Sequence, residues 1–138
     1  MDTYNAAMKR AKESAKDLVE DAVSFTKAKD LNTYNGWAEY IEALESLDVS
    51  EMAHQDSDGW DTVIYHYKAM RLCLEAPSSV LHEAESMSED FGGDQVGLFE
   101  LASRIAYFIV YQALADALQA EIDGCLELAQ SLQENCPE

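Results

Sequence analysis

Apolar residues recur at helical spacing along nearly the whole chain, and this period constrains the fold more than any other feature. Residues 4 to 25 follow it most strictly, with apolar side chains separated by alternating steps of four and three. The members are Tyr4, Met8, Ala11, Ala15, Leu18, Ala22 and Phe25. Such spacing is typical of a helix face that packs on another helix. Two prolines and six glycines interrupt the 138 residues, and no run alternates with the period of a strand. We therefore predict an all-α fold.

A second helix is predicted to begin after Asn32 or Thr33, since either side chain can cap it. Its inward face carries Tyr34, Trp37, Ile41 and Leu44. Acidic residues spaced three apart follow its other side as a ridge that climbs about 4.5 Å per step. The ridge consists of Glu39, Glu42, Glu45 and Asp48.

The next boundaries are set by polar residues and a proline. Residues 50–58 are predicted to form a short turn of helix and a loop. Ser57 or Asp58 is then expected to cap a helix that includes Trp60. Pro77 ends that helix, because proline lacks the backbone N–H and clashes with the preceding turn.

Serine and glycine residues predict the bounds of the following helix. Ser78 or Ser79 starts it, and Gly92-Gly93 stops it. The residues predicted to point inward are Leu81, Ala84 and Met87. Asp94 is expected to cap the last segment, which has helical character from about 95 to 135.

The last segment is predicted to supply the core helix. Unbroken, it would be about 60 Å long, so we expect a bend or break near Gly97 or Gly124. Its middle, residues 105–111, is apolar all round, which indicates that other helices surround it. We therefore predict one domain over residues 1–138, a compact bundle of about five helices with a long C-terminal core helix.

The charge divides the chain into two unequal parts. The sequence has 27 acidic and 9 basic residues, a formal net charge of −18. Residues 1–29 hold six of the basic residues and five acids, which predicts a mixed-charge amphipathic helix. Residues 30–138 hold three basic residues against 22 acids and form a strongly acidic body. Direct binding of nucleic acid or of an anionic membrane is excluded, because those partners need a positive surface.

Signals for export and membrane insertion are absent from the sequence pattern. The basic N-terminal region lacks the apolar run of a secretory signal. The longest uncharged stretch, 105–115, is shorter than the roughly 18 residues that a membrane span needs. The three cysteines, Cys73, Cys125 and Cys136, are odd in number and lack metal-ligand spacing. We therefore expect free thiols in a reducing cytoplasm.

No motif for catalysis or metal binding is complete. Glu51 and His54 have the Glu-x-x-His spacing of di-iron bundles, but such sites need two of these motifs. Residues 54–65 resemble a calcium loop without its ligands at the first and last positions. Cys73 has no recognisable His partner and is interpreted as a core thiol. We predict no catalytic residues, no metal and no cofactor. Asp56, Asp58 and Asp61 are expected to complement the N-terminal end of the following helix.

The excess of acids suggests imitation of DNA. Duplex DNA carries one charge per about 1.7 Å, so the charge of −19 in the acidic body corresponds to about 32 Å of duplex. A compact domain of this length is about 37 Å across, so the acids match a length of DNA that the protein could replace if they gather on one face. The candidate phosphate-mimicking acids are Glu39, Glu42, Glu45, Asp48, Glu51, Asp56, Asp58, Asp61, Glu83, Glu85, Asp116, Glu121, Asp123 and Glu127.

The chain resembles the phage- and plasmid-encoded DNA-mimic antirestriction proteins. The likeness rests on the Leu/Ile/Tyr-rich stretch 98–118 and on the run Asp-Gly-Trp-Asp-Thr-Val-Ile-Tyr at 58–65, and it covers mainly 58–132. It implies a homodimer whose carboxylates stand in for phosphates and block the DNA channel of a type I restriction enzyme or another nuclease. The mixed-charge first helix departs from the family pattern, which leaves the dimer arrangement and the target open.

Three other classes of function remain open. One is a helical adaptor or inhibitor, such as an anti-CRISPR protein or a transcription-factor inhibitor, that binds through an apolar groove and uses its acidity for solubility. Another is a globular protein adapted to high salt, although its acids would be spread evenly. The last is an enzyme. Under both the DNA-mimic and the adaptor hypotheses, the partner is a protein in the host cytoplasm. Under DNA mimicry, that protein is a basic DNA-binding protein or nuclease.

Overall fold

A computed structural model describes residues 2–27, 31–60, 67–89 and 97–136, and for residues 25–27 the backbone alone. These ranges contain six α-helices and no strand, which confirms the all-α prediction. The helices are α1 (Asp2–Lys27), α2 (Tyr34–Glu45), α3 (Val49–Asp58), α5 (Tyr67–Glu75), α6 (Ser78–Glu89) and α7 (Leu98–Glu134). The predictions for Phe25, Asp61, Gly92-Gly93 and Asp94 lie outside the residues whose side chains are described.

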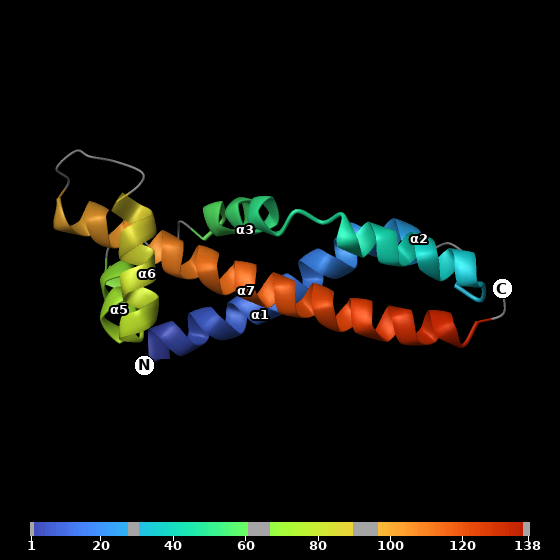
Figure 1. The fold of residues 1–138 in the computed structure, drawn as a ribbon. Helices are drawn as coiled ribbons and strands as arrows, with labels where there is room; N and C mark the ends of the chain where they lie inside the picture. Colours follow the sequence, from blue (N-terminus) through green and yellow to red (C-terminus); the bar gives the residue numbers. More distant parts are fainter. Residues whose placement is uncertain (1, 28–30, 61–66, 90–96, 137–138) are drawn as a thin grey trace.

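Helix α7 is the central helix of the molecule, and every other described helix packs on it. Figure 1 shows α1 crossing behind α7, α2 and α3 following one side of it, and α5 and α6 standing across its N-terminal end. The 37 residues of α7 correspond to about 55 Å. The solvent-accessible surface is 8427 Å², more than the roughly 7,200 Å² of an average folded monomer of this mass. The bundle is therefore elongated along α7.

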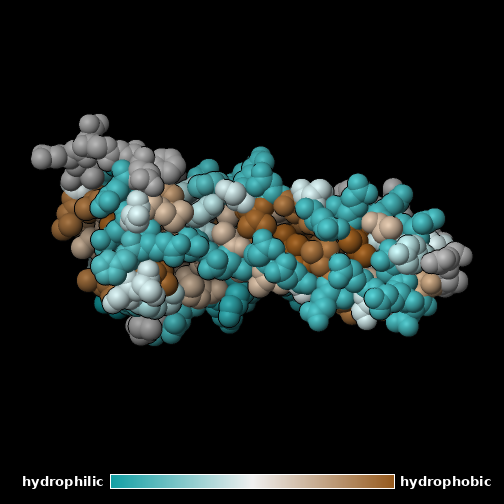
Figure 2. Space-filling view, viewed as in Figure 1, coloured by the Kyte–Doolittle hydropathy of each residue, from teal (hydrophilic) through white to brown (hydrophobic). Residues whose placement is uncertain are grey.

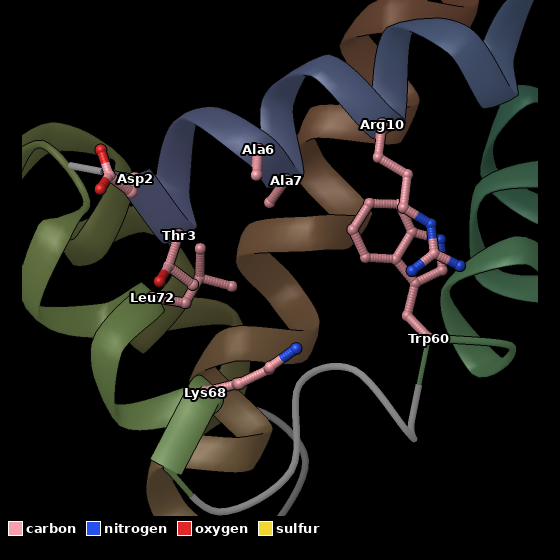
Figure 3. A pocket seen from close by; sticks show the side chains of 8 residues that line it. All are labelled: Asp2, Thr3, Ala6, Ala7, Arg10, Trp60, Lys68 and Leu72. Carbon is pink, nitrogen blue, oxygen red and sulfur yellow. The ribbon is translucent and has the colours of Figure 1, made fainter.

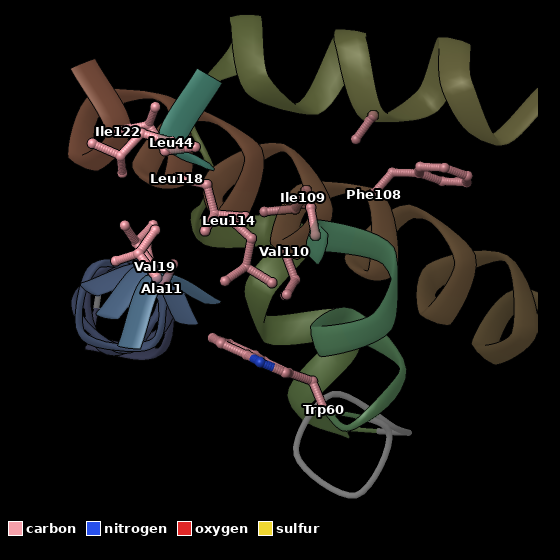
Figure 4. Close-up of a cluster of buried hydrophobic side chains, with 14 of the residues drawn as sticks. Ala11, Val19, Leu44, Trp60, Phe108, Ile109, Val110, Leu114, Leu118 and Ile122 are labelled. Atoms are coloured by element: carbon pink, nitrogen blue, oxygen red, sulfur yellow. The ribbon is translucent and has the colours of Figure 1, made fainter. Parts of the chain in front are cut away.

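The core side chains of α7 come from its central turns. Ile109, Leu114 and Leu118 are fully buried, and Figure 4 shows them along α7, with Leu118 nearest to Val19 of α1 and Leu44 of α2. Because helices cover several sides of this stretch, its apolar residues need not follow one stripe. An 18-residue window of α7 has a mean hydropathy of 1.2, enough by length and composition to cross a membrane. A core helix of a soluble protein meets the same criterion.

The glycines expected to bend the last helix behave differently. Gly97 is the N-cap, with φ −65° and ψ 161°, and the helix begins at the next residue. Gly124 lies inside the continuous helix, and its α-carbon faces open space. A glycine inside a helix costs about 1 kcal/mol relative to alanine, which is too little to break a helix that packing supports on both sides of it.

The buried stripe of α1 differs from the predicted seam. The fully buried side chains are Ala11, Ala15, Val19 and Val23, so the last two replace the predicted Leu18 and Ala22. These residues are four apart, and rows of that spacing form the contact ridge when two helices cross at a large angle. In Figure 1, α1 crosses behind α7 instead of running alongside it. The alternating four-three seam would have required nearly parallel helices.

Local capping determines where α2 and α3 begin. The Thr33 hydroxyl accepts a hydrogen bond from the Gly36 backbone N–H at 3.1 Å, as predicted. Helix α2 ends at Glu45, so the predicted ridge does not continue along it to Asp48. Asp48 instead caps α3, its carboxylate accepting a hydrogen bond from the backbone N–H of Glu51 at 3.1 Å. Residues 49–58 thus form a complete helix rather than a turn and a loop.

The predicted caps Ser57 and Asp58 are the last two residues of α3. The Ser57 hydroxyl is fully buried and donates to the Ala53 carbonyl at 2.7 Å. Trp60 follows in the turn, and its indole N–H donates to the Asp56 carboxylate at 3.1 Å. Asp56 and Asp58 therefore lie at the negative end of α3, and the residues directly after Trp60, where the next helix is predicted to continue, lie outside the described ranges.

Pro77 separates α5 from α6 as predicted. Helix α5 ends at Glu75, and the Pro77 carbonyl accepts the first hydrogen bond of α6, from the Leu81 N–H at 2.9 Å. Helix α6 starts at Ser78 and buries Ala84. The predicted inward residues Leu81 and Met87 are half-buried beside the core.

Candidate functional site

The described candidate acids lie on the surface of four helices. All but Asp61 fall within the described ranges. Those that are exposed are Glu39, Glu42, Glu45, Asp48, Glu51, Asp58, Glu83, Asp116, Asp123 and Glu127. Those that are half-buried are Asp56, Glu85 and Glu121. Helices α2, α3, α6 and α7 carry all of them except Asp48, which directly precedes α3, and Figure 2 shows mostly hydrophilic surface on one face of the molecule.

Several of these carboxylates are held by neutral donors. Asp48 accepts from a backbone N–H and Asp56 from an indole N–H. Glu51 accepts from the side-chain amide of Gln55 at 3.2 Å, and Asp123 from that of Gln119 at 2.9 Å. Hydrogen bonds from uncharged groups orient a carboxylate and leave its negative charge in place.

The acidic body has few cations to neutralise this surface. Two of its three basic residues, Arg71 and Arg104, form ion pairs with Glu75 and Glu100 at 3.3 and 3.6 Å. Both acids lie outside the candidate set. Each of these two arginines therefore pairs with an acid of its own helix and does not pair with a candidate acid.

The ends of the helices show an unusual order of charge. The last residues of α2, α3, α6 and α7 are Glu45, Asp58, Glu89 and Glu134, and the last turn of each helix has no basic residue. Among the described residues, none of these four carboxylates has a hydrogen bond or an ion pair. The helix dipole is negative at this end, so each acid there destabilises its helix by about 0.3–1 kcal/mol.

The sequence argument missed two of these terminal acids, Glu89 and Glu134. The signal that could have found them is an acidic residue just before a helix terminator. Glu134 directly precedes Asn135, the C-cap of α7. Lysine or arginine is the usual residue at such positions.

The aromatic residues of α7 hold α3 in place. Nδ1 of His54 lies 2.9 Å from the Tyr107 hydroxyl, and the His54 ring stacks on Tyr111 with centroids 4.1 Å apart. The Tyr111 hydroxyl in turn lies 3.0 Å from the Ser50 hydroxyl. His54 thus contacts phenols instead of a second metal-ligand motif. Within the described ranges, no three His, Cys, Asp or Glu side chains are grouped to hold a metal ion.

The three cysteines are free thiols. Burial, with a smaller contribution from Glu85, raises the pKa of the Cys73 thiol to about 11. The thiol also donates to the Ala102 carbonyl at 3.5 Å. A thiol that stays protonated at neutral pH is a poor nucleophile.

Comparisons of the chain with models of protein families, with curated proteins and with solved structures found no match. The candidate site is therefore described by its own residues: a set of mostly exposed acids distributed over α2, α3, α6 and α7, on an elongated helical scaffold.

Proposed function

We propose that this protein is a DNA mimic that inhibits a host defence nuclease or another DNA-binding protein by occupying its DNA-binding site. The observation that carries the proposal is the set of acids at the ends of α2, α3, α6 and α7. Those positions oppose the helix dipoles and destabilise the fold. Folding does not account for acids at four such ends, whereas selection for a polyanionic surface does. The setting is the cytoplasm of the host cell, and the partner is basic.

The dimensions refine the comparison with DNA. A net charge of −18 along the roughly 55 Å of α7 gives one charge per about 3 Å. Duplex DNA has one charge per about 1.7 Å of axis, and a single strand has one per about 3.4 Å. One chain therefore corresponds to the charge of one strand. Two chains in a homodimer would supply the charge of both strands.

The orientation of the acids also supports imitation. The carboxylates of Asp48, Glu51, Asp56 and Asp123 are held by hydrogen bonds from neutral donors. A binding surface with fixed side chains loses less entropy when its partner binds. Such an array is better suited to a fixed set of lysines and arginines than a flexible acidic tail.

The test is inhibition of DNA cleavage or binding, measured for a type I restriction enzyme and for other basic DNA-binding proteins over a range of salt concentrations. The body variant carries five neutral substitutions: Glu42→Gln, Glu45→Gln, Glu51→Gln, Asp123→Asn and Glu127→Gln. The matched control changes the same charge on α1: Asp2→Asn, Glu13→Gln, Asp17→Asn, Glu20→Gln and Asp21→Asn. Both variants have the same net charge.

We expect the native protein to compete with DNA, and its inhibition to weaken steeply as salt rises. The body variant should lose inhibition while the α1 variant retains most of it. Equal losses of inhibition in the two variants would show that net charge alone is responsible, and would overturn the proposal. Inhibition that does not change with salt, or no inhibition of any protein tested, would also overturn it.

A second candidate function is an adaptor or inhibitor that binds through an apolar groove. A cavity of about 580 Å³ lies between α1 and α7, and its lining combines the apolar residues Met8, Ala113, Ala117 and Ala120 with the charged residues Lys12, Asp116 and Glu121. Figure 2 also shows a hydrophobic strip over the middle of the molecule, beside α7. On this hypothesis, Ala117→Glu abolishes binding to the partner, whereas the five-residue body variant slows association and leaves most of the affinity intact.

A further inference from the structure

A pocket at the N-terminal end of α1 differs in charge from the rest of the molecule. It has a volume of about 320 Å³ and lies between α1, α5 and the turn that carries Trp60. Ala6, Ala7, Leu72 and Trp60 are its apolar lining residues, and the last two are almost fully buried. Its charged groups include the guanidinium of Arg10 and the ammonium of Lys68. Figure 3 shows the Lys68 side chain directed toward the space below Ala6 and Ala7.

The guanidinium of Arg10 is held in a fixed position by an aromatic platform. Its central carbon lies 4.0 Å from the centroid of the Trp60 ring. Trp60 is 2% exposed, and its N–H donates to Asp56, so the indole is itself fixed. A guanidinium stacked on an aromatic face keeps its N–H groups at the edge free to donate.

Both cations lie in a protein with three acids for every base. Neither Arg10 nor Lys68 forms an ion pair or a hydrogen bond among the described residues. Asp2 also lines the pocket, but in Figure 3 its carboxylate lies at the end opposite Arg10 and points away from it. The pocket therefore presents unpaired positive charge beside an apolar wall.

We propose that this pocket binds a small amphipathic carboxylic acid. The carboxylate would lie between Arg10 and Lys68, where the planar fork of a guanidinium can bind both of its oxygens. The apolar body would contact Ala6 and Ala7, the apolar lining residues that have accessible surface. A volume of 320 Å³ is at the small end of the range for ligand sites, which are mostly apolar with a few polar groups.

The probe is 3-phenylpropionate, and its uncharged control is 3-phenylpropionamide. Binding is measured by titration calorimetry and by the NMR shift of the Trp60 indole N–H. We expect saturable binding of the acid, and binding of the amide weaker by about tenfold or more, because the amide cannot form charge-assisted hydrogen bonds. Inorganic phosphate, which lacks the apolar body, should bind more weakly than the acid.

Three variants locate the site. Arg10→Gln and Lys68→Gln each remove one cation, and each should weaken acid binding by about tenfold. Ala6→Leu leaves both cations in place, and its larger side chain, added at an exposed position of the lining, should reduce binding of acid and amide alike. The matched control, Lys16→Gln, removes one exposed charge elsewhere on α1 and should leave binding unchanged. Circular dichroism checks that each variant is folded.

The proposal is independent of DNA mimicry, since its residues lie outside the candidate acids and its readout is a small ligand. Absence of saturable acid binding would overturn it, as would equal affinities for the acid and the amide. If Lys16→Gln lowered the affinity for the acid as much as Arg10→Gln does, the proposal would also be overturned, because the net charge of the protein would then account for its attraction of the acid. If Arg10→Gln does not fold, Lys68→Gln and Ala6→Leu still decide the outcome.

Discussion

At the scale of single residues, Glu75 differs from the other acids at helix ends. Its Oε1 accepts hydrogen bonds from the backbone N–H groups of Thr3 and Tyr4 at 2.9 and 3.2 Å. Its Oε2 lies 3.3 Å from Nε of Arg71. The carboxylate is thus at the positive end of α1, where negative charge is stabilising. Glu75 fastens α5 to α1 and is not part of the exposed acidic surface.

Glu75 should make stability depend on pH. Burial opposes its ionisation, but hydrogen bonds from the amino terminus, Tyr4 and Thr3 outweigh burial and lower the pKa from 4.5 to about 2. A lowered folded-state pKa contributes stability that is complete above the unfolded pKa and is lost as pH falls from about 4.5 to about 2. Glu75→Gln should therefore unfold more easily at pH 7, and its difference from the native protein should shrink over that range.

Denaturant unfolding of Glu75→Gln and the native protein, between pH 2 and pH 7, measures this difference. Glu83→Gln serves as the control, because it removes one exposed carboxylate from another helix. A Glu75→Gln protein as stable as the native one at pH 7 would contradict the assignment.

The Cys73 thiol should be unreactive in the folded protein. Burial and Glu85 raise its pKa from 9.0 to about 11, which lowers the thiolate fraction at pH 8 by about 100-fold. Alkylation by iodoacetamide, followed by mass spectrometry, should be slower by about that factor in the folded protein than in urea. The rate should rise as pH approaches 11. Rapid labelling at pH 8 under native conditions would show that the thiol is activated.

At the scale of helices, the structure places negative charge against the dipoles of α2, α3, α6 and α7. Helices normally have acids in the first turn and cations in the last. Here the described ends of these four helices have acids at the last position and no cation in the last turn. Helix α1, which is nearly neutral, ends instead at Lys27. The reversed order is therefore confined to the acidic body.

Neutralising the terminal acids should stabilise the protein. Glu45→Gln and Glu134→Gln remove exposed charges that have no described partner, and each should raise the free energy of unfolding by about 0.3–1 kcal/mol. Chemical denaturation of the single and double variants measures the gain. Under the proposed function, the same double variant should inhibit a DNA-binding protein less well, since stability and function oppose each other at such positions. A loss of stability would contradict the dipole argument.

At the scale of the whole molecule, shape and charge act together. The elongated bundle spreads its negative charge along the 37 residues of α7, which reduces repulsion below that of a compact sphere with the same charge. Repulsion among the acids of the body still opposes folding, because the unfolded chain separates them further.

Salt should therefore stabilise the protein. Raising NaCl from 10 mM to about 0.5 M shortens the Debye length from about 30 Å to a few Å, which screens most of this repulsion. The melting temperature should rise by several degrees over this range. In the five-residue body variant the rise should be smaller. A melting temperature that falls or stays constant would show that repulsion is not a significant cost in the folded state.

The predictions that were confirmed depend on interactions between residues close together in the chain. The all-α class, the start of α2 at the Thr33 cap and the break at Pro77 follow from periodicity, side-chain capping and the geometry of proline. The division into a nearly neutral first helix and an acidic body is likewise a property of composition. The candidate acids on α2 were assigned to the right helix for the same reason.

Contacts between distant residues decided the rest. The angle at which α1 crosses α7 selected Val19 and Val23 for the core, and packing on both sides carried α7 through Gly124. Glu75 reaches Thr3, 72 positions away, and Arg10 stacks on Trp60. Such pairs leave no periodic trace in the sequence, because their geometry exists only after the helices have packed. Local chemistry thus determined which segments are helical, and tertiary packing determined which side chains meet.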